Sequence, residues 1–142
     1  MHTRSPYDLL QERAAAGAHP EWRVAFTAIL LNKTNGDQVR PIFEEIFEMF
    51  PGPHDFLRAS AAQTSRLVAI LRPLGLITRR MLNLRRMTED FVRGNPISKC
   101  YGCGQYAVDS VETFCYDRPS NLSNDPWIRK YIEWLETTSV KA

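Results

Sequence analysis

The stretch Lys99-Cys100-Tyr101-Gly102-Cys103-Gly104-Gln105-Tyr106-Ala107 carries the clearest structural signal in this sequence of 142 residues. Its two glycines lie two positions apart, directly before an amphipathic segment that begins at Gln105. This pattern is typical of a helix-hairpin-helix turn at about residues 99–107, because glycine lets the backbone approach a phosphate and the amides of the next helix can bind an anion. A plain tight loop would also explain two close glycines, so the flanking sequence has to decide between these interpretations.

Apolar residues recur at helical spacing on both sides of the hairpin, and no run alternates in the manner of a strand. We therefore predict an all-α fold in a single compact domain over residues 1–142, since a chain of this length can bury one substantial core. The first helix is expected to have Ser5 as its N-cap and Pro6 as its first residue. Glycine, proline and polar turns divide the chain into expected helices at 7–16, 22–31, 38–50, 54–59, 61–71, 77–93, 105–116 and 126–138.

The charge of the chain permits nucleic-acid binding without requiring it. The formal net charge is +2 and the pI is about 8.5. Arginines crowd one stretch, where they could meet a bound polyanion or form a solvated helix surface. They are Arg72, Arg79, Arg80, Arg85, Arg86 and Arg93.

The cysteine count and the apolar runs indicate an intracellular protein without a membrane span. No apolar run reaches the roughly 18 residues that a span requires, and the N-terminus lacks the pattern of a signal peptide. Three cysteines do not make a disulfide framework. Cys100 and Cys103 have metal-site spacing, but with Cys115 alone and no nearby histidine they are too few for a closed zinc or iron–sulfur site, so we expect no metal and no cofactor.

Asp125 directly precedes Pro126, a combination that favours a helix start with the aspartate as N-cap. That role alone accounts for the residue. A carboxylate at a helix N-terminus also stays ionised, and beside a flipped nucleotide it could stabilise an oxocarbenium-like sugar or orient an attacking water. The rival candidates are Asp117, at the end of the preceding helix, and Asp109, which we expect to face solvent or to cap a hydrogen-bond network.

Five ordered blocks of sequence, from about Ser5 to Leu135, resemble the glycosylase domain of the methyl-CpG-binding mismatch thymine and uracil DNA glycosylases, within the helix-hairpin-helix superfamily. The blocks are Ser-Pro-Tyr-Asp-Leu-Leu-Gln-Glu at 5–12, Leu-Asn-Lys-Thr-Asn-Gly at 31–36, Pro-Leu-Gly-Leu at 73–76, the hairpin and helix at 102–109, and Asp125 with Lys130, Tyr131, Trp134 and Leu135. The resemblance implies the helix-hairpin-helix DNA glycosylase fold.

The resemblance also assigns roles to individual residues. It makes Asp125 the catalytic aspartate, Tyr106 an active-site tyrosine and Gln11 the residue that reads the extruded base. Lys33 matches the place where the family inserts an arginine into the gap left by the flipped nucleotide, and Leu76 matches a leucine wedge from the opposite side. Without the resemblance, Gln11 would be interpreted as a solvent-facing helix residue and Leu76 as a core residue after a turn.

The hairpin glycines and the first residue of the next helix, Gly102, Gly104 and Gln105, are expected to bind a DNA phosphate. The partner implied is double-stranded DNA that contains a mismatched or damaged base, bound by a monomer in the nucleus. Lysine at the Tyr106 position of bifunctional relatives forms a Schiff base with the sugar, which tyrosine cannot do. The chain is thus expected to excise thymine or uracil opposite guanine and to leave the abasic strand intact.

Three departures from the family pattern lie close to these residues. Lys33 replaces an arginine and lacks its planar fork, and Pro126 stands where a histidine commonly follows the aspartate, after a loop that is one residue shorter. Trp22, Trp127 and Trp134 are expected in the core, although Trp127 could lie near DNA. The sequence leaves two alternative functions open: a helix-hairpin-helix module that binds DNA without chemistry, and a glycosylase for methylated or oxidised cytosine.

Overall fold

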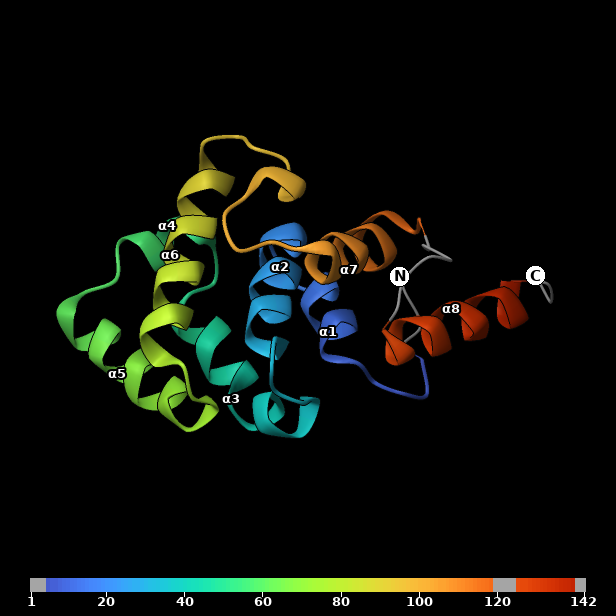
Figure 1. Ribbon diagram of the computed structural model, residues 1–142, viewed down its shortest axis with the longest axis horizontal. Helices are drawn as coiled ribbons and strands as arrows, with labels where there is room; N and C mark the ends of the chain where they lie inside the picture. Colours follow the sequence, from blue (N-terminus) through green and yellow to red (C-terminus); the bar gives the residue numbers. More distant parts are fainter. Residues whose placement is uncertain (1–4, 119–124, 140–142) are drawn as a thin grey trace.

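Helices make up all the regular structure that the computed structural model describes, in residues 5–118 and 125–139 (Figure 1). The prediction of an all-α fold in one compact domain is therefore confirmed, and the arrangement is consistent with the helix-hairpin-helix glycosylase fold. The shorter loop expected before Asp125 falls mostly on residues 119–124, which lie outside the described residues. The elements are α1 (Leu10–Ala16), α2 (Pro20–Leu31), α3 (Gly36–Met49), α4 (Pro53–Leu57), α5 (Ala61–Leu71), η1 (Arg72–Leu74), α6 (Ile77–Val92), η2 (Ile97–Lys99), α7 (Gln105–Tyr116) and α8 (Pro126–Ser139).

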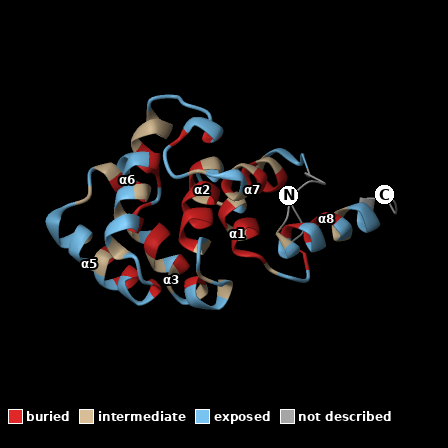
Figure 2. Cartoon of the chain, in the orientation of Figure 1, coloured by how far each residue is buried: buried red, intermediate tan, exposed pale blue. Residues whose placement is uncertain are grey.

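Helix α2 is the centre of the core. Its residues from Val24 to Leu30 are all buried, and it packs against α1, α3, α6 and α7 (Figure 2). Trp22 and Phe26 meet in an edge-on contact with ring centroids 5.3 Å apart, and both also contact Phe47 and Phe56. Such aromatic clusters combine a large buried area with favourable ring geometry.

A second, smaller core holds α8 to the rest of the molecule. Ile128, Tyr131 and Ile132 lie on one face of α8 and pack with Phe114 of α7 and with Leu9. Their spacing is that of a helix with a single apolar face. This packing fixes the start of α8 beside the segment that precedes α1.

The first helix begins later than predicted. Ser5 does not cap it, because the backbone of Asp8 is left-handed, with φ of 47°. A helix therefore cannot run through residue 8, and α1 begins at Leu10. The carboxylate of Glu12 accepts hydrogen bonds from the Ser5 amide (2.6 Å), the Ser5 hydroxyl (2.7 Å) and the Leu9 amide (2.7 Å). Glu12 therefore caps α1 from within the helix, and the expected start at residue 7 is wrong.

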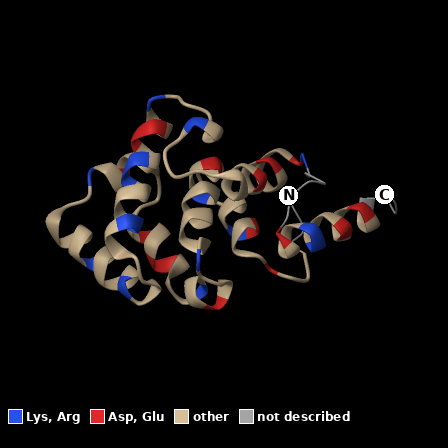
Figure 3. Cartoon of the chain, in the orientation of Figure 1, with Lys and Arg blue, Asp and Glu red and all other residues tan. Residues whose placement is uncertain are grey.

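Two residues differ from the prediction in their burial: Arg80 is buried and Trp127 is exposed. Basic segments recur along α6 (Figure 3), yet Arg80 is only 4% exposed and its guanidinium contacts backbone carbonyls, so it cannot belong to a solvated arginine surface. Trp127 is 51% exposed rather than in the core, because Ile128 and Tyr131 occupy the packing face of α8. Trp22 is fully buried, as expected, and Trp134 is partly buried.

Among the described residues, none of the helices is both long enough and apolar enough to span a bilayer.

A buried hydrogen bond between α2 and α6 gives a test of the core. The indole Nε1 of Trp22 donates to the hydroxyl of Thr88 (3.0 Å), which itself donates to the Leu84 carbonyl. Thr88→Val leaves the buried indole N–H without an acceptor, and we expect a loss of about 1–3 kcal/mol in the free energy of unfolding, measured by urea denaturation. Thr137→Val removes a similar hydroxyl on exposed α8 and should change stability by less than about 0.5 kcal/mol. Equal stability of the two variants would contradict the role of this hydrogen bond in the core.

Candidate functional site

A cleft of about 770 Å³ opens where four segments that are far apart in the sequence meet. These are the start of α1, the turn between α2 and α3, the start of α7 and the start of α8. Its lining residues include Tyr7, Leu9, Leu10, Gln11, Leu31, Asn32, Lys33, Thr34, Asn35, Gly36, Asp37, Arg40, Tyr106, Asp125 and Trp127. Four of the residues predicted from the sequence, Gln11, Lys33, Tyr106 and Asp125, thus lie around one cavity.

Gln11 lies in the first turn of α1 and is 3% exposed. Its side-chain Nε2 donates a 2.6 Å hydrogen bond to the hydroxyl oxygen of Tyr106, although the two residues are 95 positions apart. The interpretation of Gln11 as a solvent-facing residue is therefore wrong. The amide is held at the wall of the cleft by a partner on α7.

Tyr106 is the second residue of α7; it is half-buried and packs against the small core that α8 forms with Phe114 and Leu9. Burial raises the pKa of its phenol well above the ordinary value, and the negative charge of Asp125 raises that pKa further, against a smaller opposite effect of the Gln11 hydrogen bond. The phenol consequently keeps its proton throughout the neutral range. Its oxygen accepts from Gln11, and its O–H can donate to a second acceptor.

Asp125 is the N-cap of α8, as expected. Its Oδ1 accepts a 2.9 Å hydrogen bond from the amide of Trp127, in the first turn of the helix. The positive end of the α8 dipole interacts favourably with a carboxylate in this position. Since the carboxylate also lines the cleft and acts electrostatically on Tyr106, capping and an active role can coexist at this residue.

The two rival aspartates lie elsewhere. Asp109 is buried in α7, where its carboxylate accepts a 2.8 Å hydrogen bond from Nε2 of Gln105, so the solvent-facing alternative is wrong and the network alternative fits. Asp117 ends α7 in a left-handed conformation and is exposed. Neither residue lines the cleft.

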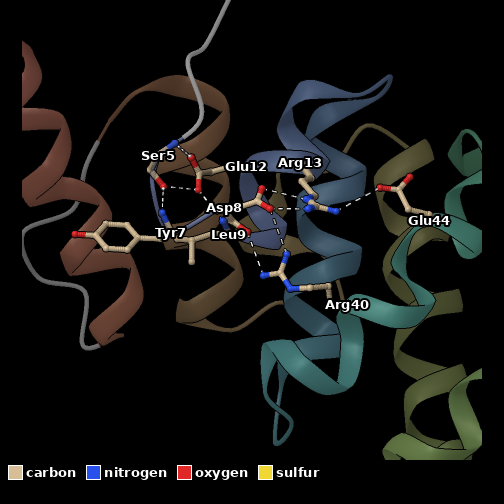
Figure 4. A network of polar contacts seen from close by, with 8 residues as sticks. All are labelled: Ser5, Tyr7, Asp8, Leu9, Glu12, Arg13, Arg40 and Glu44. Atoms are coloured by element: carbon tan, nitrogen blue, oxygen red, sulfur yellow. Dashed lines mark hydrogen bonds and ion pairs between the residues drawn. The ribbon is translucent and has the colours of Figure 1, made fainter.

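A network of ion pairs fixes the segment from which Gln11 projects (Figure 4). The carboxylate of Asp8 accepts from Arg13 of α1 and lies 3.6 Å from Nη1 of Arg40, whose Nη2 also donates to the Asp8 carbonyl (3.1 Å). Arg13 in turn lies 3.8 Å from Glu44 of α3. These contacts stabilise the left-handed turn at Asp8. Because α1 begins directly after this turn, they also fix the position from which Gln11 lines the cleft.

The two residues predicted to enter DNA project from left-handed turns. Lys33, with φ of 60°, is exposed and lines the cleft. Leu76, with φ of 51°, follows Gly75 and is 55% exposed, so its interpretation as a core residue is wrong. Leu76 does not line the cleft but lies on a separate turn before α6.

The hairpin precedes α7, whose second residue, Tyr106, lines the cleft. Gly102 has φ of 78°, which side-chain-bearing residues rarely adopt, and a Cβ there would lie 3.3 Å from Asn83 of α6. Gly104 precedes α7, and a Cβ at this position would meet no atom within 4 Å. The carboxylate of Asp90 accepts from the Tyr101 amide (2.8 Å), which ties the hairpin to α6. Gly102, Gly104 and Gln105 do not line the cleft themselves.

No site role was predicted from the sequence for Tyr7, Arg40 or Lys130, and a place near DNA was given only as an alternative for Trp127. Tyr7 and Trp127 pack edge to face with centroids 6.1 Å apart, and Nζ of Lys130 lies 4.6 Å above the Trp127 ring. The position of Trp127, two residues after Asp125, was the one available signal. Arg40 carried no local signal, because its partner Asp8 lies 32 positions earlier.

The three cysteines are free thiols in protected surroundings. Burial raises the pKa of Cys103 to about 12, and that of Cys115 to about 12 as well, so neither is a reactive thiolate. Among the described residues, no group of three or more histidine, cysteine or acidic side chains could hold a metal ion.

Comparison with known proteins finds distant relatives. The chain is 30% identical over 135 residues to the Methyl-CpG-binding domain protein 4-like protein of Arabidopsis thaliana, which covers 93% of this chain and 29% of that protein. It is 29% identical over 117 residues to the Thymine/uracil-DNA glycosylase of Pyrobaculum aerophilum, which covers 76% of this chain and 50% of that protein. No protein-family model matches the chain. It spans half or less of the length of these relatives, and the similarities are consistent with a DNA glycosylase family.

The buried carboxylate of Glu12 gives a test of how α1 is placed. Glu12→Gln keeps the size of the side chain but turns one acceptor oxygen into an NH₂ group that faces the Ser5 and Leu9 donors. We expect a loss of about 1–3 kcal/mol in the free energy of unfolding by urea denaturation. Glu44→Gln, at an exposed carboxylate, should cost less than about 1 kcal/mol. If Glu12→Gln is no less stable than Glu44→Gln, the capping role assigned to Glu12 is wrong.

Proposed function

We propose that this chain is the catalytic domain of a monofunctional DNA glycosylase of the helix-hairpin-helix class, acting on thymine or uracil mispaired with guanine. The single observation that carries the proposal is the convergence of Gln11, Tyr106 and Asp125 on one cleft. The amide and the phenol are joined by a 2.6 Å hydrogen bond, and the carboxylate raises the pKa of that phenol. An amide, a neutral hydroxyl and a carboxylate are the groups needed to read a base and to act on its sugar.

The cleft suits an extruded nucleotide. Its volume of about 770 Å³ lies within the range of small-molecule sites, and enzymes that act on a base in duplex DNA must extrude that base into a pocket. The amide of Gln11 offers both a donor and an acceptor, which matches the N–H and carbonyl groups on the edge of thymine or uracil. A mispaired base costs less to extrude than a paired one, which supplies part of the selectivity.

Asp125 performs the central chemical role in this proposal. As the bond between the sugar and the base breaks, its electron pair leaves with the base and positive charge develops on the sugar. The Asp125 carboxylate stabilises that charge or orients the water that attacks the anomeric carbon. The water's oxygen forms the new bond to the anomeric carbon, and the proton that the water loses passes to the departing base anion, so hydrolysis needs no other co-reactant.

Tyr106 determines the fate of the DNA strand once the base has been released. A phenol whose pKa is raised stays neutral and donates a hydrogen bond, but it has no amine to form a Schiff base with the sugar. We therefore propose that the abasic strand stays intact. Tyr106 holds Gln11 in place and assists the base or the sugar through its hydroxyl.

The surroundings of the cleft supply the proposed DNA contacts. Lys33 enters the gap left by the extruded nucleotide and Leu76 enters from another turn, since both are exposed on left-handed backbone. Gly102, Gly104 and Gln105 bind a phosphate through backbone amides at the start of α7, and the open space beside Gly104 leaves room for its oxygens. The exposed arginines of α6, such as Arg79 and Arg86, extend this basic surface.

The whole protein's role follows from the same chemistry. We propose that a monomer binds double-stranded DNA containing a mismatched base and starts base excision repair. In a eukaryotic cell this work is done in the nucleus. We further propose that residues 1–142 act as one glycosylase domain, with the hairpin at about 99–107 as its main phosphate contact.

Single-turnover base release tests the proposal. Duplexes carrying G·T, G·U and normal pairs are incubated with wild type, Asp125→Asn and the matched control Asp117→Asn, and alkali then reveals abasic sites. We expect release from the mismatched duplexes only, and a decrease of about 10²-fold or more for Asp125→Asn with little change in duplex affinity. Asp117→Asn alters an exposed carboxylate outside the cleft and should keep the wild-type rate.

Three outcomes would contradict parts of this proposal. Strand cleavage without alkali would overturn the assignment of Tyr106 as a residue that excludes lyase chemistry. Release from duplexes with methylated or oxidised cytosine, but not from G·T or G·U, would overturn the substrate. Duplex binding without release of any base, unchanged in Asp125→Asn, would identify the chain as a DNA-binding module.

A further inference from the structure

A buried guanidinium joins the two turns that carry Lys33 and Leu76. Arg80 lies in the first turn of α6 and is 4% exposed. Its Nε donates to the Gly75 carbonyl (2.9 Å) and its Nη2 to the Leu74 carbonyl (3.3 Å). Its Nη1 donates to the carbonyls of Ile29 and Leu30, both at 3.3 Å. One side chain therefore bonds to the end of η1 and to the last turn of α2.

The partners of Arg80 explain how the charge can be buried. Carbonyls at the end of a helix lack intrahelical partners and carry the negative end of the helix dipole. The acceptors that the structure shows for Arg80 are four carbonyls at or just after the ends of α2 and η1 rather than a carboxylate, and the Ile29 carbonyl also accepts from the Asn32 amide (3.3 Å). Burial lowers the pKa of Arg80 from its ordinary value, yet arginine remains protonated at neutral pH.

Each set of carbonyls is followed by a left-handed turn with an exposed side chain. Gly75 is followed at once by Leu76, with φ of 51°, and Leu30 is followed three residues later by Lys33, with φ of 60°. The Leu30 carbonyl is shared, because it also accepts a 2.6 Å bond from the hydroxyl of Thr34 in the Lys33 turn. Left-handed backbone at residues other than glycine costs on the order of 1 kcal/mol each and persists only where the surroundings hold it.

We propose that Arg80 is a positioning residue that fixes the Lys33 turn and the Leu76 turn relative to each other, so that both side chains enter the duplex together. The proposal rests on the proposed function for its consequence, although the mechanical coupling itself can be measured without DNA. Insertion from two turns at once requires a fixed spacing between them, and misplacement of about 1 Å can cost a reaction about 10²-fold. Arg80 supplies that spacing through one rigid group.

The shape of arginine is essential to this role. The planar guanidinium directs its nitrogens toward different acceptors, so it can bond to η1 and α2 at the same time. A lysine at this position keeps the charge but ends in a compact ammonium on a flexible chain. Arg80→Lys should therefore hold one turn and release the other, whereas Arg80→Met removes all four bonds and keeps much of the volume.

Hydrogen–deuterium exchange of the free protein tests the coupling directly. In Arg80→Met we expect faster exchange at residues 30–36 and at residues 74–78 together, with Arg80→Lys protecting one of the two segments better than the other. Arg79→Met, at the exposed neighbouring position, should match wild type. Leu67→Ala, a core truncation in α5, controls for a general loss of stability. Loosening of the 74–78 segment alone in Arg80→Met would overturn the proposal.

Fluorescence of 2-aminopurine next to a G·T pair then tests the consequence, since this base brightens when its neighbour leaves the stack. We expect Arg80→Met to reduce base extrusion and single-turnover release by about tenfold or more at saturating enzyme, well below its melting temperature, with Arg80→Lys in between. Extrusion in Arg80→Met equal to that in Leu67→Ala would reduce Arg80 to a stabilising residue and overturn the proposal. If wild type releases no base at all, the proposed function fails, and the exchange experiment alone decides whether Arg80 couples the turns.

Discussion

The burial of α2 on all sides is the constraint on which the rest of the structure depends. Residues 24–30 of α2 are all buried and, apart from Thr27, all apolar, so this part of the helix has to be covered on every side, and α1, α3, α6 and α7 supply that cover. This arrangement sets the start of α1 beside the start of α7, and the turn after α2 beside both. The packing of these helices around α2 therefore also forms the cleft, which lies at the C-terminal end of α2.

Around this core, the surface contains residues in conformations or environments that are unfavourable on their own. Leu76 is exposed and Lys33 and Asp8 have left-handed backbone, all of which cost free energy in a small domain. Each of these features has a specific support: arginine contacts at Asp8 and carbonyl contacts from Arg80 near the other two. Arginine side chains, buried at Arg80 and partly exposed at Arg13 and Arg40, thus stabilise turns that local sequence preferences would not favour.

Helix-ending residues in the sequence made most of the fold predictable, whereas contacts between residues far apart in the sequence could not be predicted. Proline, glycine and polar turns predicted the bounds of α2 to α8 to within about two residues, which is the usual accuracy for helix ends. The predicted start of α1 was wrong because Arg40, 32 positions after Asp8, stabilises a turn at that residue. Within the site, the N-cap role of Asp125 could be predicted because Pro126 follows it directly. The bond between Gln11 and Tyr106, and the burial of Arg80, depend on tertiary packing that no short motif encodes.

The replacement after Asp125 illustrates how local geometry can survive a change of sequence. Proline at the first position of α8 has no N–H, so the first amide available to the Asp125 carboxylate is that of Trp127, and this is the bond that forms. The carboxylate therefore keeps its helix cap whatever the side chain at position 127. The indole itself packs against Tyr7 and under Lys130 at the rim of the cleft. It follows that the backbone of α8 sets the position of the carboxylate, while the side chains of Pro126 and Trp127 are exposed beside it and Trp127 lines the cleft.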